Sequence, residues 1–262
     1  MWVRSLRERI CNPAFPERLY RMTEARQQFL KTSYERVMED IESAVIRRGE
    51  HKPVQLLAAS KTMPAEDIVY LSDVGLKYAG ENRQQEFTEK YDAVKAAKNP
   101  AEYHFIGHLQ TNKVKFLIGR ADLIHSVDSV HLAAEISRQA CRAGITVPIL
   151  GQVNIGEEEA KSGVSPEAAS EFFAEIGEMK GISLRGMMVV APICEEKAKI
   201  REYFRYSYKI FIDFFGKNTH NIREAILSMG MSDTYDIAIE EGATMVRVGS
   251  ALFGNRNYGT GV

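Results

Sequence analysis

Eight short apolar or β-branched runs alternate with helix-like segments from residue 53 onward, and this alternation limits the fold more than any other feature of the sequence. Such an order is typical of parallel βαβ units, in which each strand is followed by a helix that covers the sheet. Eight units within about 200 residues predict an α/β protein with a single (β/α)8 barrel of the TIM type. The runs cover residues 53–60, 77–81, 102–108, 123–129, 147–154, 184–190, 225–232 and 244–250.

Helix signals between the runs support this interpretation. Residues 64–67 (PAED) have the composition of a helix first turn, and residues 165–167 (SPE) are typical of a cap followed by proline at the first helical position. Residues 180–181 (KG) predict the end of that second helix. The competing architecture is an open doubly wound sheet. However, no G-x-G-x-x-G fingerprint follows the first run, and eight units suit a closed barrel better.

The chain divides into two expected parts. Residues 1–50 are expected to form an N-terminal extension and a helix, and residues 51–262 the barrel. The first 21 residues contain five arginines but no apolar core of a secretory signal, which favours a cytoplasmic protein. An amphipathic pattern begins at Met22, so the preceding residues are either an accessory extension or the product of an upstream start codon. Both readings stay open.

Composition indicates a small-molecule partner. The chain has 34 basic and 35 acidic residues, a formal charge of −1 and no long run of one sign, which argues against nucleic acid and polybasic membrane contacts. No apolar run approaches the roughly 18 residues that a membrane span requires. Cys11, Cys141 and Cys194 form no C-x-x-C pair, so we interpret them as reduced thiols.

Lys61 directly follows the first predicted strand. In a (β/α)8 barrel the chemistry lies at the carboxyl ends of the strands. A lysine at that place can be partly desolvated, which lowers its pKa and frees the amine to attack an aldehyde. The alternative is a solvated surface lysine, which position alone does not exclude.

The loops after the seventh and eighth predicted strands have the composition of an anion site. Phosphate sites in such barrels are commonly built from these two loops. Gly230 permits a close backbone approach and Ser232 offers a hydroxyl donor ahead of a helix, while Gly249 and Ser250 occupy the next strand end. Glycine and serine are common in loops, so either pair alone is weak evidence, but the two pairs together predict a phosphate site.

Arg247 lies within the eighth run, where strand alternation points its side chain into the barrel. A buried arginine needs an acceptor. One alternative is an ion pair with a barrel carboxylate, and the other is an acceptor on a ligand that lies between Lys61 and the phosphate loops.

Several long segments carry a family resemblance. They are AASKTM around Lys61, GENRQQE (80–86), HFIGHLQTNK (104–113), HSVDS (125–129), GMMVVAP (186–192) and GMSDTYDIAIEEGATMVRVGSALFG (230–254). From about residue 53 to 254 the chain resembles the pyridoxal 5′-phosphate (PLP) homeostasis protein family, barrel proteins related to the PLP domain of alanine racemase. Met63 departs from the polar or basic residue often found at its position, and VVAP (189–192) stands in a variable segment.

The resemblance implies a fold-type III PLP protein in which Lys61 carries PLP as a Schiff base. It implies that Arg247 faces the pyridine nitrogen, which then stays unprotonated, so that the ring is a weak electron sink. Asn82 is expected near the cofactor, although an amide at a strand end can equally cap the following helix. The residues implied to hold the phosphate are Ser232, Gly249 and Ser250.

Two further patterns have simpler explanations. His104 and His108 show the i, i+4 spacing of helical zinc motifs, but in an extended run they would lie about 13 Å apart, so no metal site is predicted. Four aromatic residues recur at spacings of four, three and four, which predicts the core-facing stripe of a helix: Phe204, Tyr208, Phe211 and Phe215.

The resemblance implies a role in intracellular PLP homeostasis. The chain would bind, buffer or deliver PLP, with PLP and PLP-dependent apo-enzymes as partners, as a monomer or alternatively a dimer. No catalytic residue is assigned, and nothing beyond a weak side activity is expected.

Two enzymatic alternatives remain. A PLP-dependent racemase needs acid/base groups on both faces of the bound amino acid, and Lys61 supplies one. The resemblance implies that in alanine racemases the second acid/base group is a tyrosine from a separate β-domain. This sequence ends within eight residues of Gly254, so no such domain is expected. The second alternative is a PLP-free Schiff-base aldolase on Lys61.

Overall fold

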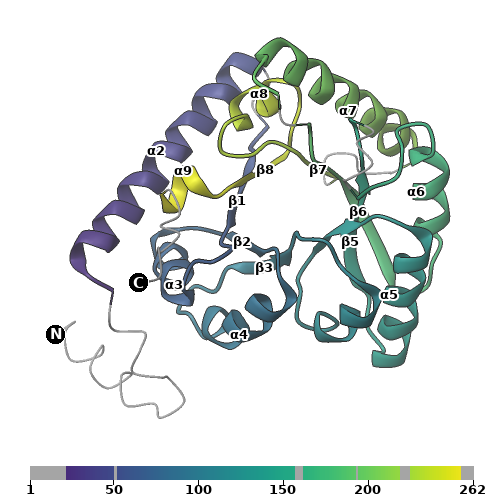
Figure 1. Ribbon diagram of the computed structural model, residues 1–262, viewed down its shortest axis with the longest axis horizontal. Helices are drawn as coiled ribbons and strands as arrows, with labels where there is room; N and C mark the ends of the chain where they lie inside the picture. The colour runs from purple at the N-terminus through teal and green to yellow at the C-terminus, as the bar shows by residue number, and fades with distance from the viewer. Residues whose placement is uncertain (1–21, 50–51, 157–161, 193, 219–224, 255–262) are drawn as a thin grey trace, which may run out of the picture.

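The computed structural model describes residues 22–49, 52–156, 162–192, 194–218 and 225–254. Eight parallel strands close into a barrel in the order β1 to β8, and the helices surround it (Figure 1). The predicted (β/α)8 barrel is therefore confirmed, and the open doubly wound sheet is wrong. The strands are β1 Gln55–Ala59, β2 Tyr78–Glu81, β3 Glu102–Phe105, β4 Ile124–Val127, β5 Val147–Val153, β6 Ile182–Val189, β7 Ile226–Ser228 and β8 Met245–Val248.

Each predicted run contains or overlaps one strand, and every run except 77–81 was too long at its carboxyl end. The run over residues 102–108, for example, contains β3, which ends at Phe105. The later residues of these runs turn away into the loops at the barrel mouth. β6 instead begins two residues before its predicted run, because Ile182 pairs with Val147 of β5.

Helices cover the outside of the barrel. They are α2 Glu24–Arg48, α3 Ala65–Val74, α4 Gln84–Lys95, the 3-10 helix η2 Thr111–Phe116, α5 Val130–Ala143, α6 Ala169–Gly177, α7 Lys197–Asn218, α8 Tyr235–Glu240 and α9 Ser250–Phe253. The first turn predicted at residues 64–67 is confirmed, with Pro64 at the N-cap of α3.

The predicted bounds of the second of those helices were wrong. Residues 166–168 form a turn, and α6 begins only at Ala169. A hydrogen bond from the Ala168 N–H to the Ser165 hydroxyl (3.4 Å) lies in the turn before the helix. The helix ends at Gly177, so Lys180 and Gly181 lie in the connection to β6.

Two separate apolar clusters reflect the alternation of side chains along the strands. Ile149 and Met187 belong to the large cluster between the sheet and the helices, whereas their neighbours Leu150 and Met188 form a small cluster with Leu123. Because neighbouring strand residues point to opposite faces, the small cluster lies inside the barrel.

The aromatic stripe on α7 packs as predicted. Phe204, Phe211 and Phe215 are buried, and Tyr208 is half-buried against the large cluster. A Cβ at Gly242 would lie 2.4 Å from the Tyr208 ring, so the ring fills the space that glycine leaves. Within the described ranges, no helix combines the length and apolar character needed to span a bilayer.

The N-terminal helix α2 lies along the outside of the barrel beside α3, α8 and α9 (Figure 1). Its Arg26 forms an ion pair with Asp67 of α3 (2.5 Å) and donates to the Phe253 carbonyl oxygen in α9 (3.0 Å). The Tyr235 hydroxyl of α8 donates to Asp40 (2.8 Å). Helix α2 thus supports the loops that follow β7 and β8. Its buried face consists of Leu30, Ser33, Val37, Ile41 and Ala44.

Candidate functional site

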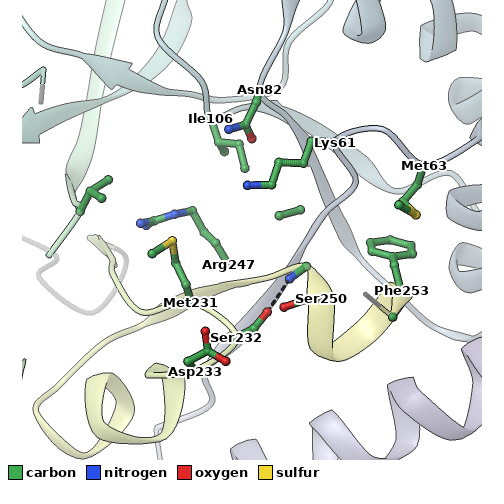
Figure 2. Close-up of a pocket in the computed structure, with 14 residues that line it drawn as sticks. Lys61, Met63, Asn82, Ile106, Met231, Ser232, Asp233, Arg247, Ser250 and Phe253 are labelled. Carbon is green, nitrogen blue, oxygen red and sulfur yellow. Dashed lines mark hydrogen bonds between the residues drawn. The ribbon is translucent and has the colours of Figure 1, made fainter. Parts of the chain in front are cut away.

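A cavity of about 340 Å³ opens at the carboxyl ends of the strands (Figure 2). This size is within the range of small-molecule sites. All six site residues predicted from the sequence line it: Lys61, Asn82, Ser232, Arg247, Gly249 and Ser250. The other lining residues are Ala59, Met63, Ile106, Val190, Met231, Asp233, Phe253 and Gly254.

Lys61 lies two residues beyond β1, and its amine extends into the pocket (Figure 2). The backbone around it is fixed on both sides. The Ser60 N–H donates to the Gly80 carbonyl oxygen (2.9 Å), and the Met63 N–H donates to the Ser60 carbonyl oxygen (3.0 Å). Thr62, with φ +67°, is the only described residue other than glycine in the left-handed region. A non-glycine residue keeps this costly conformation only where its surroundings impose it.

A charged cluster around the buried carboxylate of Glu81 supplies that constraint. Lys90 of α4 forms an ion pair with Glu81 at the end of β2 (2.6 Å), and its amine also donates to the Ser60 carbonyl oxygen (3.2 Å). The Ser60 hydroxyl donates to Glu81 (2.8 Å), and Glu86 accepts the Thr62 N–H (2.7 Å). Burial raises the pKa of Glu81, while Lys90 and the Ser60 hydroxyl lower it. The cluster therefore holds the residues on both sides of the pocket lysine.

Arg247 points into the barrel, as predicted from strand alternation, and is 6% exposed. Its Nη1 donates to the Ser228 carbonyl and hydroxyl oxygens (both 2.8 Å), and its Nη2 donates to the Val189 carbonyl oxygen (2.8 Å). Among the described residues no carboxylate forms an ion pair with it, so that open alternative is not supported. Burial lowers the pKa of Arg247 to about 10, which leaves it cationic at neutral pH.

The two loops after β7 and β8 are joined through Ser232. Its Oγ accepts the backbone N–H groups of Gly249 (3.1 Å) and Ala251 (3.3 Å). The hydroxyl proton of Ser232 remains available as a donor. Gly230, with φ +90°, permits the turn between β7 and Ser232, and a Cβ there would lie 2.6 Å from the Cβ of Ala238. Ser250 lies between the two amides that Ser232 binds, so its hydroxyl shares the same end of the pocket.

Asn82 follows β2 and lines the pocket beside Lys61 (Figure 2). Helix α4 has Arg83 at its N-cap without a side-chain cap bond, so Asn82 is not the cap that the sequence left as an alternative. A Cβ at Gly107 would lie 1.8 Å from the Asn82 carbonyl oxygen, so only glycine allows the loops after β2 and β3 to meet.

The two histidines considered as metal ligands lie in different environments. His104 is buried in β3, where its Nδ1 is 3.0 Å from the Nε2 of His125. His108 lies beyond the strand and contacts Ser162 (3.1 Å) and Asp128 (3.4 Å). No group of three or more potential metal ligands occurs in the described part of the chain.

Several site residues were not predicted from the sequence. Ile106 and Val190 each follow a strand directly, a position that marks the barrel mouth and could have indicated both. Phe253 and Met231 have no comparable signal in the sequence. The charged cluster of Glu81, Lys90 and Glu86 was also missed, because it depends on how α4 packs against β2.

Fold and site together define a class of protein: (β/α)8 barrels with one lysine and one buried arginine in a pocket at the mouth. A family model described as "Alanine racemase, N-terminal domain" matches residues 44–257. Two solved structures are similar. An unknown protein from Bifidobacterium adolescentis is 36% identical with a TM-score of 0.82, over 88% of this chain and 97% of the other. PipY of Synechococcus elongatus, with PLP bound, is 31% identical with a TM-score of 0.69, over 80% and 100%.

A curated relative has a more specific name. The "Pyridoxal phosphate homeostasis protein" of Aquifex aeolicus is 44% identical over 224 residues, which cover 85% of this chain and 96% of the relative. The chain belongs to the pyridoxal phosphate homeostasis protein family.

Proposed function

We propose that this protein binds PLP through Lys61 and acts in PLP homeostasis, by holding, buffering or delivering the cofactor. The observation that carries the proposal is one pocket in which a lysine amine, two serine hydroxyls and a buried cation face a common space, the cation having no carboxylate partner among the residues that the structure describes. PLP supplies an aldehyde that an amine can bind covalently, an anionic phosphate and a ring nitrogen that accepts hydrogen bonds.

The residues of the pocket fit these three groups. The Lys61 amine is the attachment point, and Ser232, Gly249 and Ser250 bind the phosphate at the other end of the pocket. Arg247 uses three of its five N–H donors in the described hydrogen bonds, so donors remain for a ring nitrogen. Asn82 lies beside the lysine and completes the wall. PipY, a relative of similar fold, has been solved with PLP bound.

The same arrangement favours a carrier over an enzyme. Relatives are named homeostasis proteins. Arg247 remains protonated, so a contact with the ring nitrogen leaves that nitrogen without a proton, and the ring then stabilises negative charge poorly. We therefore propose that the chain has no efficient catalysis of its own, and that PLP-dependent apo-enzymes are the recipients of the cofactor.

The decisive experiment is mass spectrometry of the purified protein after incubation with PLP and reduction with borohydride. We expect a single pyridoxyl adduct on the peptide that contains Lys61. A colourless protein that instead traps a carbonyl substrate at Lys61 would favour the PLP-free aldolase. An adduct on a different lysine would contradict the site assignment.

Replacing Ser232 with alanine should weaken binding of PLP more than binding of pyridoxal, which lacks the phosphate. The variant loses a hydroxyl donor to a charged acceptor, a contribution of about 1.5 to 3 kcal/mol. It also loses the acceptor that joins Gly249 and Ala251. Dissociation constants of both ligands, measured by fluorescence titration, check this. Equal losses for PLP and pyridoxal would place the phosphate elsewhere.

The protein loaded with PLP should not racemise or transaminate ordinary amino acids at enzymatic rates. Single L-amino acids are incubated with the protein and separated by chiral chromatography, with an alanine racemase as positive control. Turnover in the usual range of about 1 to 1000 per second would require a second acid/base group and would overturn the carrier assignment.

A further inference from the structure

A line of polar side chains crosses the interior of the barrel, from the end opposite the pocket to the pocket wall. TIM-barrel interiors are usually filled by layers of apolar branched side chains, so a continuous polar line needs an explanation. Its outer member is 60% exposed and the other four are buried. In order from the outer end, this interior chain consists of Glu102, His104, His125, Ser228 and Arg247.

Each member lies within hydrogen-bonding distance of the next. The Nε2 of His104 is 3.5 Å from a Glu102 carboxylate oxygen, and its Nδ1 is 3.0 Å from the Nε2 of His125. The Nδ1 of His125 is 3.2 Å from the Ser228 hydroxyl oxygen, which accepts from Arg247 at 2.8 Å. The members come from β3, β4, β7 and β8, so the chain links strands across the barrel.

The two ends of the interior chain fix the direction of its hydrogen bonds. The guanidinium of Arg247 can only donate, so the Ser228 oxygen accepts from it. Among the described residues, the Nδ1 of His125 is the acceptor within reach of the Ser228 proton, which is therefore directed to His125. At the other end an ionised carboxylate can only accept. The hydrogen bond from His104 is the main cause that lowers the pKa of Glu102.

This direction assigns the same tautomer to both histidines. His104 carries its proton on Nε2, toward Glu102, which leaves Nδ1 as the acceptor for the Nε2–H of His125. The Nδ1 of His125 then accepts the Ser228 hydroxyl. Burial lowers the pKa of His125 well below its ordinary value, and the charge of Arg247 lowers it further, so His125 is neutral. The Tyr78 ring of β2 packs at 5.6 Å from the His104 ring.

We infer that the interior chain holds Arg247 in a single orientation toward the pocket, and that His125 and Ser228 are positioning residues for the bound cofactor. Ser228 occupies Nη1 of the guanidinium through two oxygens, and Val189 occupies one donor of Nη2. Without His125, the proton of the buried Ser228 hydroxyl would lose the partner that it has while the oxygen accepts from Arg247, and such an unsatisfied donor is costly. The role of His125 and Ser228 toward the bound cofactor rests on the proposed function, whereas the direction of the hydrogen bonds along the interior chain does not.

The direction of the hydrogen bonds along the interior chain can be tested on the protein without PLP. Nitrogen-15 NMR of histidine-labelled protein at neutral pH distinguishes the two neutral tautomers and the cation. We expect His104 and His125 to be neutral, with the proton on Nε2 in both. A proton on Nδ1 of either ring, or a doubly protonated His125, would contradict the proposed direction of the hydrogen bonds along the interior chain. This result would hold whether or not PLP binds.

A double-mutant cycle with PLP tests the positioning role. His125→Phe should weaken PLP binding roughly tenfold and shift the absorption maximum of the bound cofactor, whereas in an Arg247→Lys background the added loss should be under about twofold. His125→Gln, which keeps a donor and an acceptor, should recover part of the affinity. Ser126→Ala is the control, since Ser126 follows His125 in β4 and its buried hydroxyl has no described partner.

The outcomes of the cycle separate the two proposals. If the wild-type protein shows no PLP band, the proposed function fails. The NMR result still tests the direction of the hydrogen bonds along the interior chain. If wild type binds PLP but the losses of His125→Phe and Arg247→Lys are additive, the positioning role is wrong. If His125→Phe does not fold, Ser228→Ala and Ser228→Thr replace it. Threonine keeps the hydroxyl, so it should retain the wild-type absorption maximum, and equal shifts in both variants would contradict the inference.

Discussion

Replacing Lys61 with alanine should abolish the visible absorption band of the protein loaded with PLP and leave no adduct after borohydride reduction. The lysine amine is the group in the pocket that can attach the aldehyde covalently. The hydrogen bonds that fix this segment involve the backbone of Ser60, Thr62 and Met63, so the fold should persist. Absorption spectra and intact-mass spectrometry measure the loss, and circular dichroism checks the fold.

Lys77→Ala is the matched control, because Lys77 is exposed and directly precedes β2 at the opposite end of the barrel. This variant should keep the band and the adduct of the wild type. A Lys61→Ala protein that retained a reducible band of wild-type strength would show that another lysine carries the aldehyde.

The barrel could be predicted from the sequence because its signals are local. Alternation of apolar and helical segments gives the order of elements, and alternation within a strand places Arg247 inside. Position at strand ends is enough to bring Lys61, Asn82 and Ser232 to one pocket, as the structure shows. Helix bounds such as those of α6 were wrong because Ser165 and the turn at residues 166–168 together have the composition of a helix start.

The partners of the site residues could not be predicted, because they come from segments far apart in the sequence. Arg247 has acceptors on β6 and β7, and two of these are backbone carbonyl oxygens, which no side-chain pattern reveals. His104 and His125 are 21 residues apart and meet only when β3 and β4 pair. A sequence pattern indicates which residues face inward, but not which of them touch.

Lys90 forms an ion pair with the buried Glu81 beside the pocket lysine. We therefore expect the loss of Lys90 to destabilise the fold more than the loss of any other residue on α4. Lys90→Met leaves the fully buried Glu81 carboxylate without its cation, and breaking a buried pair by removing one partner costs about 3 to 5 kcal/mol. Glu81→Gln combined with Lys90→Met removes both charges and should recover most of this loss. Urea unfolding curves of the two variants and the wild type measure the free energy of unfolding.

The loss in Lys90→Met should also depend on pH. Burial already raises the pKa of Glu81, and the variant removes the opposing effect of Lys90, so the folded protein holds a proton that the unfolded chain releases near the ordinary pKa of 4.5. A raised folded pKa means that this stability is fully present below about pH 4.5 and is lost as pH rises, by up to about 1.4 kcal/mol per unit. Unfolding at pH 5, 6 and 7 should show that slope in the single variant and not in the double variant.

Lys95→Met provides the control on the same helix. Lys95 pairs with Asp122 at 2.5 Å, but the two side chains are 28% and 33% exposed. Water can solvate Asp122 once the lysine is gone, so this variant should lose only about 1 kcal/mol or less and show no comparable slope. Equal losses for the two lysine variants, or a flat pH profile for Lys90→Met, would mean that Glu81 is reached by water. The charged cluster would then not be what fixes the backbone on both sides of Lys61.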